Sequence, residues 1–330
     1  MNTSIPFPGP RGARTVVVGG GTMGADVAVV LARGGATVTV VDPNAAQRER
    51  LGPHVAAELE AAGLGRRASL IGSVDTLEAV DWAGVTLVVE CITERLDAKQ
   101  ALFAALVGCA PADAVLASNS SSFPISAIAH GLPTTGRMLG LHFFMPAHLV
   151  PLVEVVCGAE SAPERAAWLC DFMRACGSVP VLVRKDKPGF LANRLQHALS
   201  REAFALIDEG IASAEDVDAA VRFGFGFRYL AAGPVMQRDH AGIDVHCAAA
   251  ATMYPTLSNA AEPARALGDR VARGDLGMKS GRGFYDWPEE KRVAERARYD
   301  ALLRHGLALL APELPAIDRS DIPFSSEPHA

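Results

Sequence analysis

The sequence predicts an α/β fold, in which a Rossmann-type, doubly wound, mostly parallel sheet is followed by an all-α C-terminal domain. Three observations predict this class. Short apolar β-forming runs alternate with helical segments through the first half of the chain, a glycine-rich turn joins the first run to the first helix, and strand patterns stop after the polar turn at 185–189. The length of 330 residues allows two domains, each with its own core.

The individual elements follow from the same patterns. Apolar runs bounded by turn residues predict strands at 15–18, 37–41, 68–72, 85–90, 114–118, 137–142, 152–156 and 179–183. Helical periodicity predicts intervening helices at 22–34, 44–62, 95–108, 124–130 and 161–176. Beyond the polar turn it predicts helices at 190–210, 214–223, 240–254, 259–273 and 289–310, before an irregular tail from Pro312.

The turn after the first strand has the spacing of a dinucleotide-binding loop. Gly19 permits the tight turn, Gly21 lets the backbone approach a pyrophosphate, and Gly24 lets helix and strand pack closely. Thr22 and Met23 lie inside this turn, where the helix N-terminus offers free N–H groups to phosphates. An ordinary strand–turn–helix is the alternative, but the second strand and the acid that ends it favour the dinucleotide.

That acid is Asp42, and it predicts NAD as the cofactor. Its carboxylate can accept hydrogen bonds from the adenosine ribose hydroxyls, and it would repel the 2′-phosphate of NADP. Pro43 follows where an NADP site would prefer an arginine. Arg48, about one turn into the next helix, is the residue that weakens this inference.

Composition excludes several classes of function. Apolar residues make up 49% of the chain and charged residues 21%, as in soluble globular proteins. The net charge of −6 argues against nucleic acid or an anionic membrane as a partner. No run is long and apolar enough for a membrane span or a signal peptide. We expect a cytoplasmic protein.

Cysteine and histidine spacing predicts neither disulfides nor a metal site. The six cysteines form no CxxC pair and lie in apolar contexts, which is typical of reduced, mostly buried thiols. The pairs His142/His148 and His240/His246 lack i, i+4 spacing and a clustered cysteine, so we expect no metal.

Polar groups follow two apolar strands at the edge where ligands sit in such folds. Glu94 and Lys99 come after the strand at 85–90, and Asn119 and Ser121 belong to the run 118–122 after the next strand. Hydroxyl and amide groups there are suited to hydrogen-bond a ligand oxygen. Helix capping by Ser122 is the alternative for one serine, but it does not explain the whole run.

His142 and Glu154 form the candidate catalytic pair. A lone histidine on an apolar face is usually a core residue, but a glutamate inside the apolar run LVEVV needs a partner because burying an unpaired carboxylate is costly. A contact between His142 and Glu154 would explain both the histidine on an apolar face and the buried glutamate. The carboxylate would select the imidazole tautomer and stabilise its charged form, which is how a general base is positioned.

The chain resembles the L-3-hydroxyacyl-CoA dehydrogenase family over residues 14–287. The motifs occur in the family's order: the glycine turn, Glu94-x-Leu96-x-x-Lys99, SNSSS at 118–122, HFFMP at 142–146, PLVEVV at 151–156, KDKPGFLANR at 185–194 and KSGRGFYDW at 279–287. Similar families include λ-crystallin, which is an L-gulonate dehydrogenase, L-carnitine dehydrogenases and a pyridine-carboxylate dehydrogenase.

This resemblance implies an NAD-dependent dehydrogenase that oxidises a secondary 3-hydroxyl to a ketone. By position it assigns His142 as the catalytic base, Glu154 as the residue that orients it, and Ser121 and Asn193 as groups that hold the substrate oxygen. It assigns Glu94, Lys99 and Lys279 to the cofactor, although solvated surface charges are the alternative for these three. It also implies a homodimer formed through the second domain and a role in fatty acid metabolism.

Two departures from the family pattern concern the substrate. Met145 replaces the asparagine of HFFNP, which makes the neighbourhood of His142 less polar or differently shaped. Acyl-CoA-specific relatives carry a longer, lysine-rich helical hairpin after the second strand, whereas this segment has no lysine and places Glu58 where a CoA contact would fall. A glutamate facing a CoA phosphate would repel it, although Arg66 and Arg67 could compensate.

The prediction is therefore a 3-hydroxyacyl-CoA dehydrogenase, with a free hydroxy acid such as L-gulonate, carnitine or a pyridine carboxylate as the alternative substrate. Arg228 could pair with the carboxylate of such an acid, or be an ordinary surface residue. A non-catalytic NAD(H)-binding or structural protein is the remote alternative. We expect a disordered lead-in at 1–13, an NAD-binding domain at 14–185, a helical dehydrogenase and dimerisation domain at 186–287, and a helix and tail at 288–330.

Overall fold

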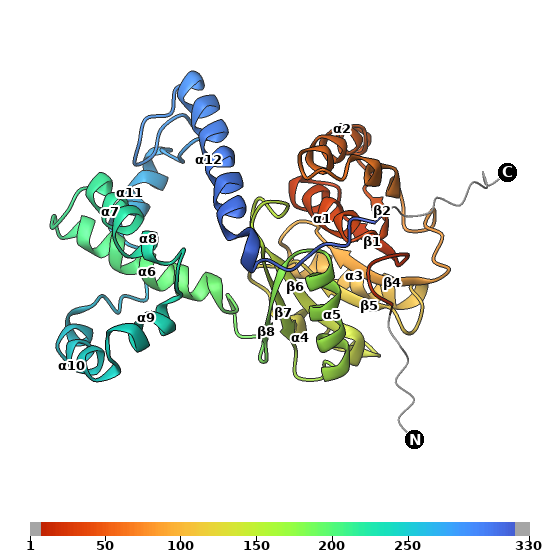
Figure 1. Ribbon diagram of the computed structural model, residues 1–330, viewed down its shortest axis with the longest axis horizontal. Helices are drawn as coiled ribbons and strands as arrows, with labels where there is room; N and C mark the ends of the chain where they lie inside the picture. The colour runs from red at the N-terminus through yellow and green to blue at the C-terminus, as the bar shows by residue number, and fades with distance from the viewer. Residues whose placement is uncertain (1–7, 321–330) are drawn as a thin grey trace. The chain divides into compact units, whose positions relative to one another are not determined.

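The computed structural model describes residues 8–320, which form two compact units (Figure 1). Of the described residues, 8–191 together with 307–320 belong to the first unit, and Ala192–Gly306 form the second.

An eight-stranded sheet forms the centre of the first unit, with strand order β3-β2-β1-β4-β5-β6-β7-β8. Neighbouring strands are parallel except β6 and β7, which pair antiparallel. The predicted doubly wound, mostly parallel sheet is therefore confirmed. The strands are β1 Arg14–Val18, β2 Thr37–Val41, β3 Ile71–Val74, β4 Val85–Glu90, β5 Val115–Ser118, β6 Met138–Phe143, β7 Leu152–Cys157 and β8 Val179–Val183.

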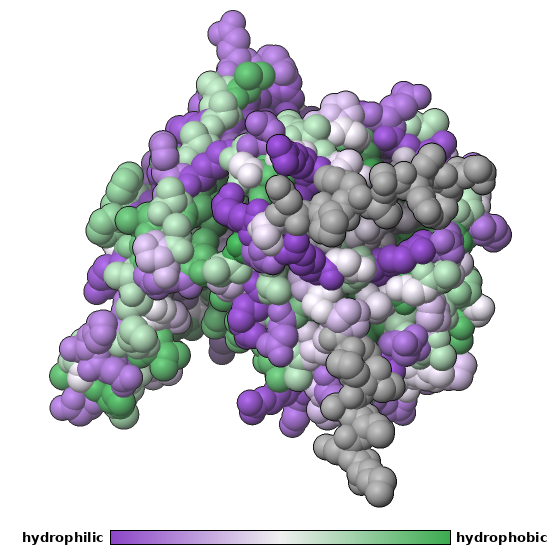
Figure 2. Space-filling view, turned by 45° about the vertical axis from the view of Figure 1, so that its right-hand side comes forward, coloured by the Kyte–Doolittle hydropathy of each residue, from purple (hydrophilic) through white to green (hydrophobic). Residues whose placement is uncertain are grey.

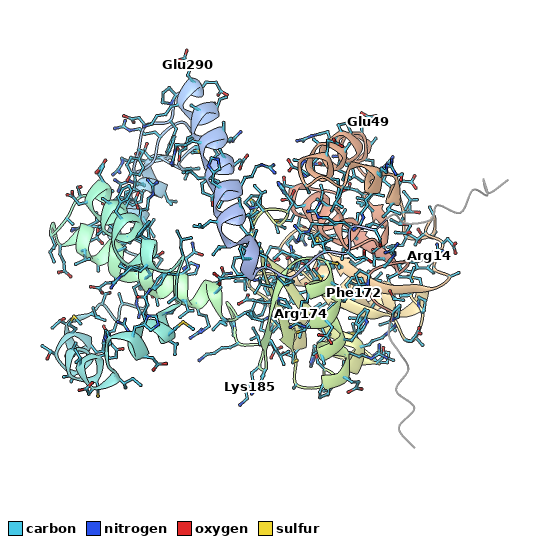
Figure 3. All side chains as sticks on the ribbon, in the orientation of Figure 1. Arg14, Glu49, Phe172, Arg174, Lys185 and Glu290 are labelled. Atoms are coloured by element: carbon cyan, nitrogen blue, oxygen red, sulfur yellow. The ribbon has the colours of Figure 1, made fainter. Side chains whose placement is uncertain are left out.

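Helices cover both faces of this sheet, because its apolar side chains alternate between two cores. In β1, Val17 packs into one core with residues of α1, α2 and α5, while Val16 and Val18 pack into the other with residues of α3 and α4. On α5, Phe172 is buried and Arg174 is exposed (Figure 3). The helices are α1 Thr22–Arg33, α2 Ala45–Ala61, α3 Leu96–Cys109, α4 Ile125–Ile128 and α5 Pro163–Ala175.

The strand expected at 68–72 is partly wrong. Residues up to Leu70 belong to a 3₁₀ turn, Gly65–Leu70, and pairing with β2 begins only at Ile71, opposite Val38. The turn is closed by the N–H of Arg67, which donates to the carbonyl of Leu64. A short apolar run such as this one fits either a strand or a tight turn, and the hydrogen bond decides between them.

The second unit is helical, as predicted, but three of its expected helices have different bounds. The helix expected at 240–254 is broken at Gly242, whose φ of 95° interrupts the helix. The helix expected at 214–223 ends at Ala220, before a π-helical turn. The helix expected at 259–273 begins only at Arg265, where the Asp208 carboxylate accepts hydrogen bonds from the first backbone N–H groups. The helices are α6 Ala192–Asp208, α7 Ala214–Ala220, α8 Gly226–Arg228, α9 Pro234–Ala241, α10 Ile243–Met253, α11 Arg265–Arg273 and α12 Glu289–Leu310.

The chain beyond α12 packs on the first unit, and from Leu314 to Ser320 it is irregular, as predicted. Ile317 contacts the core that contains α1, and the Arg67 guanidinium donates to the carbonyl of Asp318. The carboxylate of Asp318 also pairs with Arg11. The segment up to residue 320 therefore closes over one side of this unit.

All six cysteines lie in the described part of the chain and none is paired, so the expected absence of disulfides is confirmed. The expectation of mostly buried thiols is wrong in part, since only Cys176 is fully buried and Cys247 is exposed. Burial raises the pKa of Cys176 to about 12, which keeps its thiol protonated. Between residues 8 and 320, no helix has both the length and the apolar character needed to cross a bilayer.

Candidate active site

The glycine turn has the geometry that its spacing predicts. Gly19 has a φ of 103°, and a Cβ there would lie 2.6 Å from the carbonyl oxygen of Cys91, so only glycine fits. A Cβ on Gly24 would overlap the carbonyl oxygen of Gly19, which explains the close packing of α1 on the turn. Gly21 faces open space, since a Cβ at this residue would have no neighbouring atom within 4 Å. The backbone is therefore accessible at Gly21, where a pyrophosphate would approach.

The N-terminus of α1 suits an anionic group. Gly21 is its N-cap and supplies no side-chain hydrogen bond, and the first turn holds no acidic residue. The first N–H groups are thus available, and the helix dipole adds to their attraction for phosphate. Thr22 is exposed at this end, while Met23 packs partly against the core.

Asp42 lies directly after β2 and contacts the glycine turn. Its Oδ2 accepts from the backbone N–H of Gly20 at 2.7 Å, and its Oδ1 accepts from that of Asn44 at 2.8 Å. The carboxylate is therefore held in one orientation, and each oxygen keeps a further lone pair for a ribose hydroxyl. Arg48 donates to the backbone carbonyl of Asp42, which places its charge beside the acid.

A buried charge network supports the edge of the sheet beyond β4. The Nζ of Lys99 lies 2.7 Å from Glu90 Oε1, 3.1 Å from Glu94 Oε2 and 3.4 Å from the carbonyl of Ile92. Lys99 is only 1% exposed and Glu90 is completely buried. The three donors of the ammonium group are all engaged. Lys99 thus lies beneath the surface, where it holds the two glutamates.

Glu90 is a residue that the sequence reasoning missed, although a glutamate at the end of the apolar run VTLVV was a usable signal. Its carboxylate also accepts from the hydroxyl of Ser118. Glu94 in turn accepts from the Ser120 hydroxyl at 2.6 Å and from the backbone N–H of Ser122 at 3.0 Å. The serine run at 118–122 is therefore held by Glu90 at the end of β4 and by Glu94 in the loop that follows β4.

The serine run places Asn119 and Ser121 differently. Asn119 Oδ1 accepts from the backbone N–H of Phe143 at 2.9 Å, which ties the end of β5 to the end of β6. Ser121 is half-buried, with its hydroxyl 3.5 Å from that of Ser122. The capping interpretation of Ser122 is wrong, because α4 has Pro124 as its N-cap and no side-chain hydrogen bond there.

His142 and Glu154 form a buried pair. They are directly opposite one another in the antiparallel ladder of β6 and β7, and His142 Nδ1 lies 2.7 Å from Glu154 Oε2. His142 is 4% exposed and Glu154 is completely buried. The other carboxylate oxygen, Oε1, accepts from the backbone N–H of Leu191 at 3.0 Å.

The surroundings of the imidazole are aromatic. The His142 ring lies 4.6 Å from that of Phe144 and 5.5 Å from that of Phe190, measured between centroids. Within residues 8–320 no group hydrogen-bonds to its Nε2, so this nitrogen can receive a proton from a substrate. Met145, where relatives carry asparagine, is 63% exposed.

The predicted site residues are divided between the two units. Ser121, His142 and Glu154 belong to the first unit, together with the cofactor residues of the glycine turn. Asn193 is the second residue of α6 in the second unit, and Lys279 is exposed in the connection between α11 and α12. Arg228 is exposed at the end of α8.

A second polar cluster in the first unit escaped the sequence reasoning. Asp26 on α1 is 1% exposed, and its Oδ1 lies 2.8 Å from His54 Nε2 and 2.9 Å from His148 Nδ1. Burial acts to raise the pKa of Asp26, but the proximity of His148 and His54 outweighs burial and lowers it. Hydrogen bonding to Asp26 raises the pKa of His54. A single aspartate inside the apolar helix ADVAVVLA was the available signal.

In the segment after β2, where a CoA contact would fall, the side chains are also oriented differently from the prediction. Glu58 does not face outward, since its Oε2 lies 3.2 Å from His148 Nε2 and its side chain is 18% exposed. Arg67 is buried, and its guanidinium donates to the carbonyls of Arg33 and Asp318. Of the two arginines proposed to compensate, only Arg66 remains on the surface.

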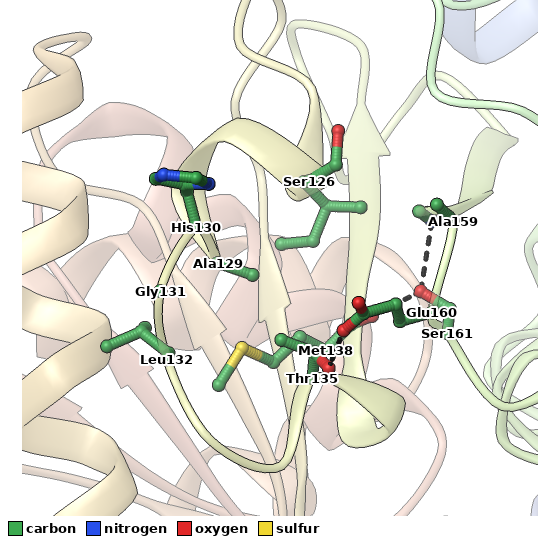
Figure 4. Close-up of a pocket in the computed structure, with 12 residues that line it drawn as sticks. Ser126, Ala129, His130, Gly131, Leu132, Thr135, Met138, Ala159, Glu160 and Ser161 are labelled. Atoms are coloured by element: carbon green, nitrogen blue, oxygen red, sulfur yellow. Dashed lines mark hydrogen bonds between the residues drawn. The ribbon is translucent and has the colours of Figure 1, made fainter.

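The first unit contains a cavity away from the catalytic candidates and another beside the glycine turn. One of about 530 Å³ is lined by residues that include Ser126, His130 and Met138 (Figure 4). Because Met138 begins β6 and His142 is near its end, this cavity is roughly 13 Å from the catalytic pair at the usual strand rise. A smaller cavity of about 110 Å³ lies against Gly20, Gly21 and Thr22, and so belongs to the dinucleotide site.

A Rossmann sheet with this glycine turn and acid defines an NAD-linked oxidoreductase. Residues 14–187 match the NAD-binding domain of the 3-hydroxyacyl-CoA dehydrogenase family, and residues 189–287 match its C-terminal domain. The chain belongs to the 3-hydroxyacyl-CoA dehydrogenase family, whose members are NAD-dependent enzymes acting on CH–OH groups.

Curated relatives differ in substrate. The chain is 34% identical over 290 residues to 5-formyl-3-hydroxy-2-methylpyridine 4-carboxylate 5-dehydrogenase of Mesorhizobium japonicum, a match that covers 86% of this chain and 94% of that one. It is 36% identical to 3-hydroxyadipyl-CoA dehydrogenase of Escherichia coli, over 84% of this chain and 59% of that one. It is 35% identical to L-carnitine dehydrogenase of Streptomyces griseus, over 86% and 87%.

The similar proteins of solved structure also differ in substrate. A crystal structure of the pyridine-carboxylate 5-dehydrogenase, described as an NAD⁺-dependent dismutase, has a TM-score of 0.84 at 30% identity and covers 90% of this chain and 98% of that one. A (S)-3-hydroxybutyryl-CoA dehydrogenase from Ralstonia eutropha has a TM-score of 0.68 at 28% identity, over 84% and 99%.

Proposed function

We propose that this enzyme oxidises the secondary hydroxyl of a small free hydroxy acid to a ketone, with NAD as the hydride acceptor. The observation that carries the reaction type is the buried pair of His142 and Glu154, with a 2.7 Å contact between Nδ1 and Oε2. A carboxylate on one ring nitrogen leaves the other nitrogen as a base aimed away from it.

In the proposed reaction each residue has a separate task. His142 accepts the hydroxyl proton at Nε2, and Glu154 stabilises the imidazolium that results. Ser121 holds the substrate oxygen by a hydrogen bond, and family resemblance assigns Asn193 the same task from the second unit. Bound NAD supplies the acceptor for the hydride. In reverse, His142 returns its proton to the substrate oxygen.

Cofactor contacts are part of the same proposal. Gly19, Gly21 and Gly24 with Thr22 and Met23 form the turn for the pyrophosphate, and Asp42 accepts from the ribose. Glu94 and Asn119 are further candidate contacts of the cofactor, and Lys279 is assigned to the cofactor by resemblance alone. Lys99 acts indirectly by holding Glu94, because its ammonium has no donor to spare.

Three observations favour a free acid over a CoA thioester. The Arg67 guanidinium, which could have met a CoA phosphate, is occupied by backbone carbonyls. The segment at 43–70 has no lysine, unlike the lysine-rich hairpin of acyl-CoA-specific relatives, although it carries four arginines. The TM-score is also higher for the pyridine-carboxylate enzyme than for the 3-hydroxybutyryl-CoA enzyme, at 0.84 against 0.68.

A 3-hydroxyacyl-CoA thioester is the second candidate. The family as a whole and the 36% identity to 3-hydroxyadipyl-CoA dehydrogenase favour it. In that case the reaction would belong to fatty acid metabolism.

The test is NADH formation on addition of 3-hydroxybutyryl-CoA, L-carnitine, L-gulonate, free 3-hydroxy acids and hydroxypyridine carboxylates. We expect turnover of a free acid and little of the thioester. Efficient turnover of the thioester alone would replace the free acid with the second candidate. Tight NADH binding with no turnover of any compound would instead favour a non-catalytic NAD(H)-binding protein.

We also propose that the second unit forms a homodimer. Within residues 192–306, all of which the structure describes, Ala266 is the only buried residue, and large apolar side chains such as Phe223, Val235 and Ile243 are more than 60% exposed. Apolar surface is visible over this helical part in Figure 2. Helices that bury so few of their apolar side chains within one unit need a second surface to cover them. Sedimentation velocity should give twice the chain mass, and a monomer at micromolar concentration would refute the dimer.

The same proposal places the enzyme in the cytoplasm, with neither nucleic acid nor membrane as a partner. Unpaired cysteines fit a reducing compartment, and the net charge of −6 disfavours polyanions. Fractionation of the source cells and retention on heparin would test the two statements separately.

A further inference from the structure

We propose that Asp26, His54 and His148 form a site for one divalent transition-metal ion of the zinc type, separate from the catalytic pair. The three residues come from α1, from α2 and from the loop after β6. One ligand atom from each lies within 4.8 Å of the other two. This goes beyond the proposed dehydrogenase activity, which does not use these residues.

The ligand set has the chemistry of zinc. Two imidazole nitrogens and one carboxylate oxygen are donors that zinc, cobalt and nickel prefer, whereas calcium and magnesium require mostly oxygen ligands. Asp26 Oδ1 is shared between the two histidine nitrogens, at 2.8 Å and 2.9 Å. A tetrahedral zinc ion holds such atoms roughly 3.3 Å apart, so a shift of roughly 0.5 Å would admit it.

The contact between His148 and Asp26 is unusual for a hydrogen bond. Although the two atoms are only 2.9 Å apart, His148 Nδ1 is buried and forms no hydrogen bond of acceptable geometry with any residue from 8 to 320. Buried ring nitrogens are normally satisfied, because leaving one unpaired is costly. A cation between the nitrogen and the carboxylate would satisfy both.

Surrounding groups orient these ligands toward a common point. Glu58 Oε2 lies 3.2 Å from His148 Nε2, so it can accept a hydrogen bond from the N–H of that nitrogen, which leaves Nδ1 with a free lone pair. The backbone N–H of Ala147 donates to Asp26 Oδ2 at 3.0 Å, which leaves Oδ1 turned to the histidines. A carboxylate on the second nitrogen of a ligating histidine is the usual arrangement around protein-bound zinc.

The site is most open to solvent at His54. Asp26 is 1% and His148 10% exposed, whereas His54 is 35% exposed and also lines the small cavity beside the glycine turn. Three protein ligands therefore leave a fourth position toward this cavity. The ion would join α1, α2 and the loop that follows His142, and so would stabilise the first unit.

The experiment uses the full chain with Cys247→Ser as background, because Cys247 is exposed and could bind zinc adventitiously. The protein is stripped with a chelator, dialysed and titrated with zinc by calorimetry, and its bound metal is counted by mass spectrometry. We expect one zinc per chain and a higher melting temperature on zinc addition. Absence of saturable binding in the background protein would overturn the proposal.

Variants locate the binding to these residues. His54→Ala and His148→Ala should abolish saturable binding, and Glu58→Gln should weaken it by about 10- to 100-fold, as for other residues that orient a metal ligand. His130→Ala, an exposed histidine of the same unit, should bind zinc normally. Undiminished binding by His54→Ala, or competition by calcium or magnesium, would refute the assignment.

Folding of the variants is checked by circular dichroism and by melting without metal. If His148→Ala fails to fold, His54→Ala and Glu58→Gln still decide the question, since both side chains are partly exposed. Dehydrogenase activity is not a readout in this test, so failure of the metal proposal would leave the proposed function unaffected.

Discussion

Glu154→Gln is the substitution that tests the proposed catalytic pair most directly. Glutamine has the size of glutamate, so the position opposite His142 in the β6–β7 ladder stays filled. Its Oε1 can still accept from the N–H of Leu191, as Glu154 Oε1 does at 3.0 Å. With that bond kept, its NH₂ group faces His142 Nδ1, where the carboxylate was 2.7 Å away.

The expected loss has two parts. Removing the charge removes a charge-assisted hydrogen bond to the imidazolium, worth about 1.5–3 kcal/mol, which corresponds to a rate loss of about 10- to 150-fold. In addition, the NH₂ group requires Nδ1 of His142 to be unprotonated, so Nε2 carries the proton and cannot act as the base. We therefore expect kcat to fall by about 10²- to 10⁴-fold, the range for loss of a general base.

The assay is NADH formation at saturating substrate, with NADH affinity measured by fluorescence and folding by thermal melting. NADH affinity should be unchanged, because the substitution does not touch the glycine turn. Glu78→Gln, at an exposed position of the same unit, is the matched control and should have normal kcat. A near-normal kcat for Glu154→Gln, or a loss that is fully explained by unfolding, would refute the role of this pair.

Three further predictions concern the cofactor side. Lys99→Met leaves Glu90 buried without its partner and should lower the free energy of urea unfolding by about 3–5 kcal/mol, against about 0.5 or less for the exposed Arg95→Met; equal losses would contradict the buried network. Asp42→Ala should reduce the preference for NAD over NADP by about tenfold or more in comparative kcat/KM measurements, and an unchanged preference would exclude the ribose contact. Burial acts to raise the pKa of Glu94, but hydrogen bonds from a serine hydroxyl and the ion pair with Lys99 outweigh it, so the folded pKa is lowered. The ionised Glu94 therefore stabilises the fold above its unfolded-state pKa of about 4.3, and this stabilisation is lost as the pH falls through the folded-state pKa. In Glu94→Gln, the free energy of unfolding should consequently decrease less steeply as the pH is lowered into the acid range. An unchanged dependence on pH would contradict this.

Much of the first unit was predictable because its signals are local. Short continuous apolar runs and the three glycines act within a few residues, and seven of the eight strands lie within one residue of their predicted bounds. The His142–Glu154 pair was predictable for a different reason, namely that a buried carboxylate requires a partner. Expectations were less accurate where a single turn decides a boundary, as at Gly242, since one backbone conformation there splits a periodic segment into two helices.

The sequence by itself determined the dinucleotide turn, the class of sheet and the pairing of His142 with Glu154. Only the tertiary structure decided the roles of the remaining charges: that Lys99 is enclosed between two glutamates, that Arg67 is covered by the segment around Asp318, and that Asp26 meets two histidines. These contacts join residues up to 251 positions apart. Their partners are set by how helices pack on the sheet, and no periodicity or motif in the chain records that packing.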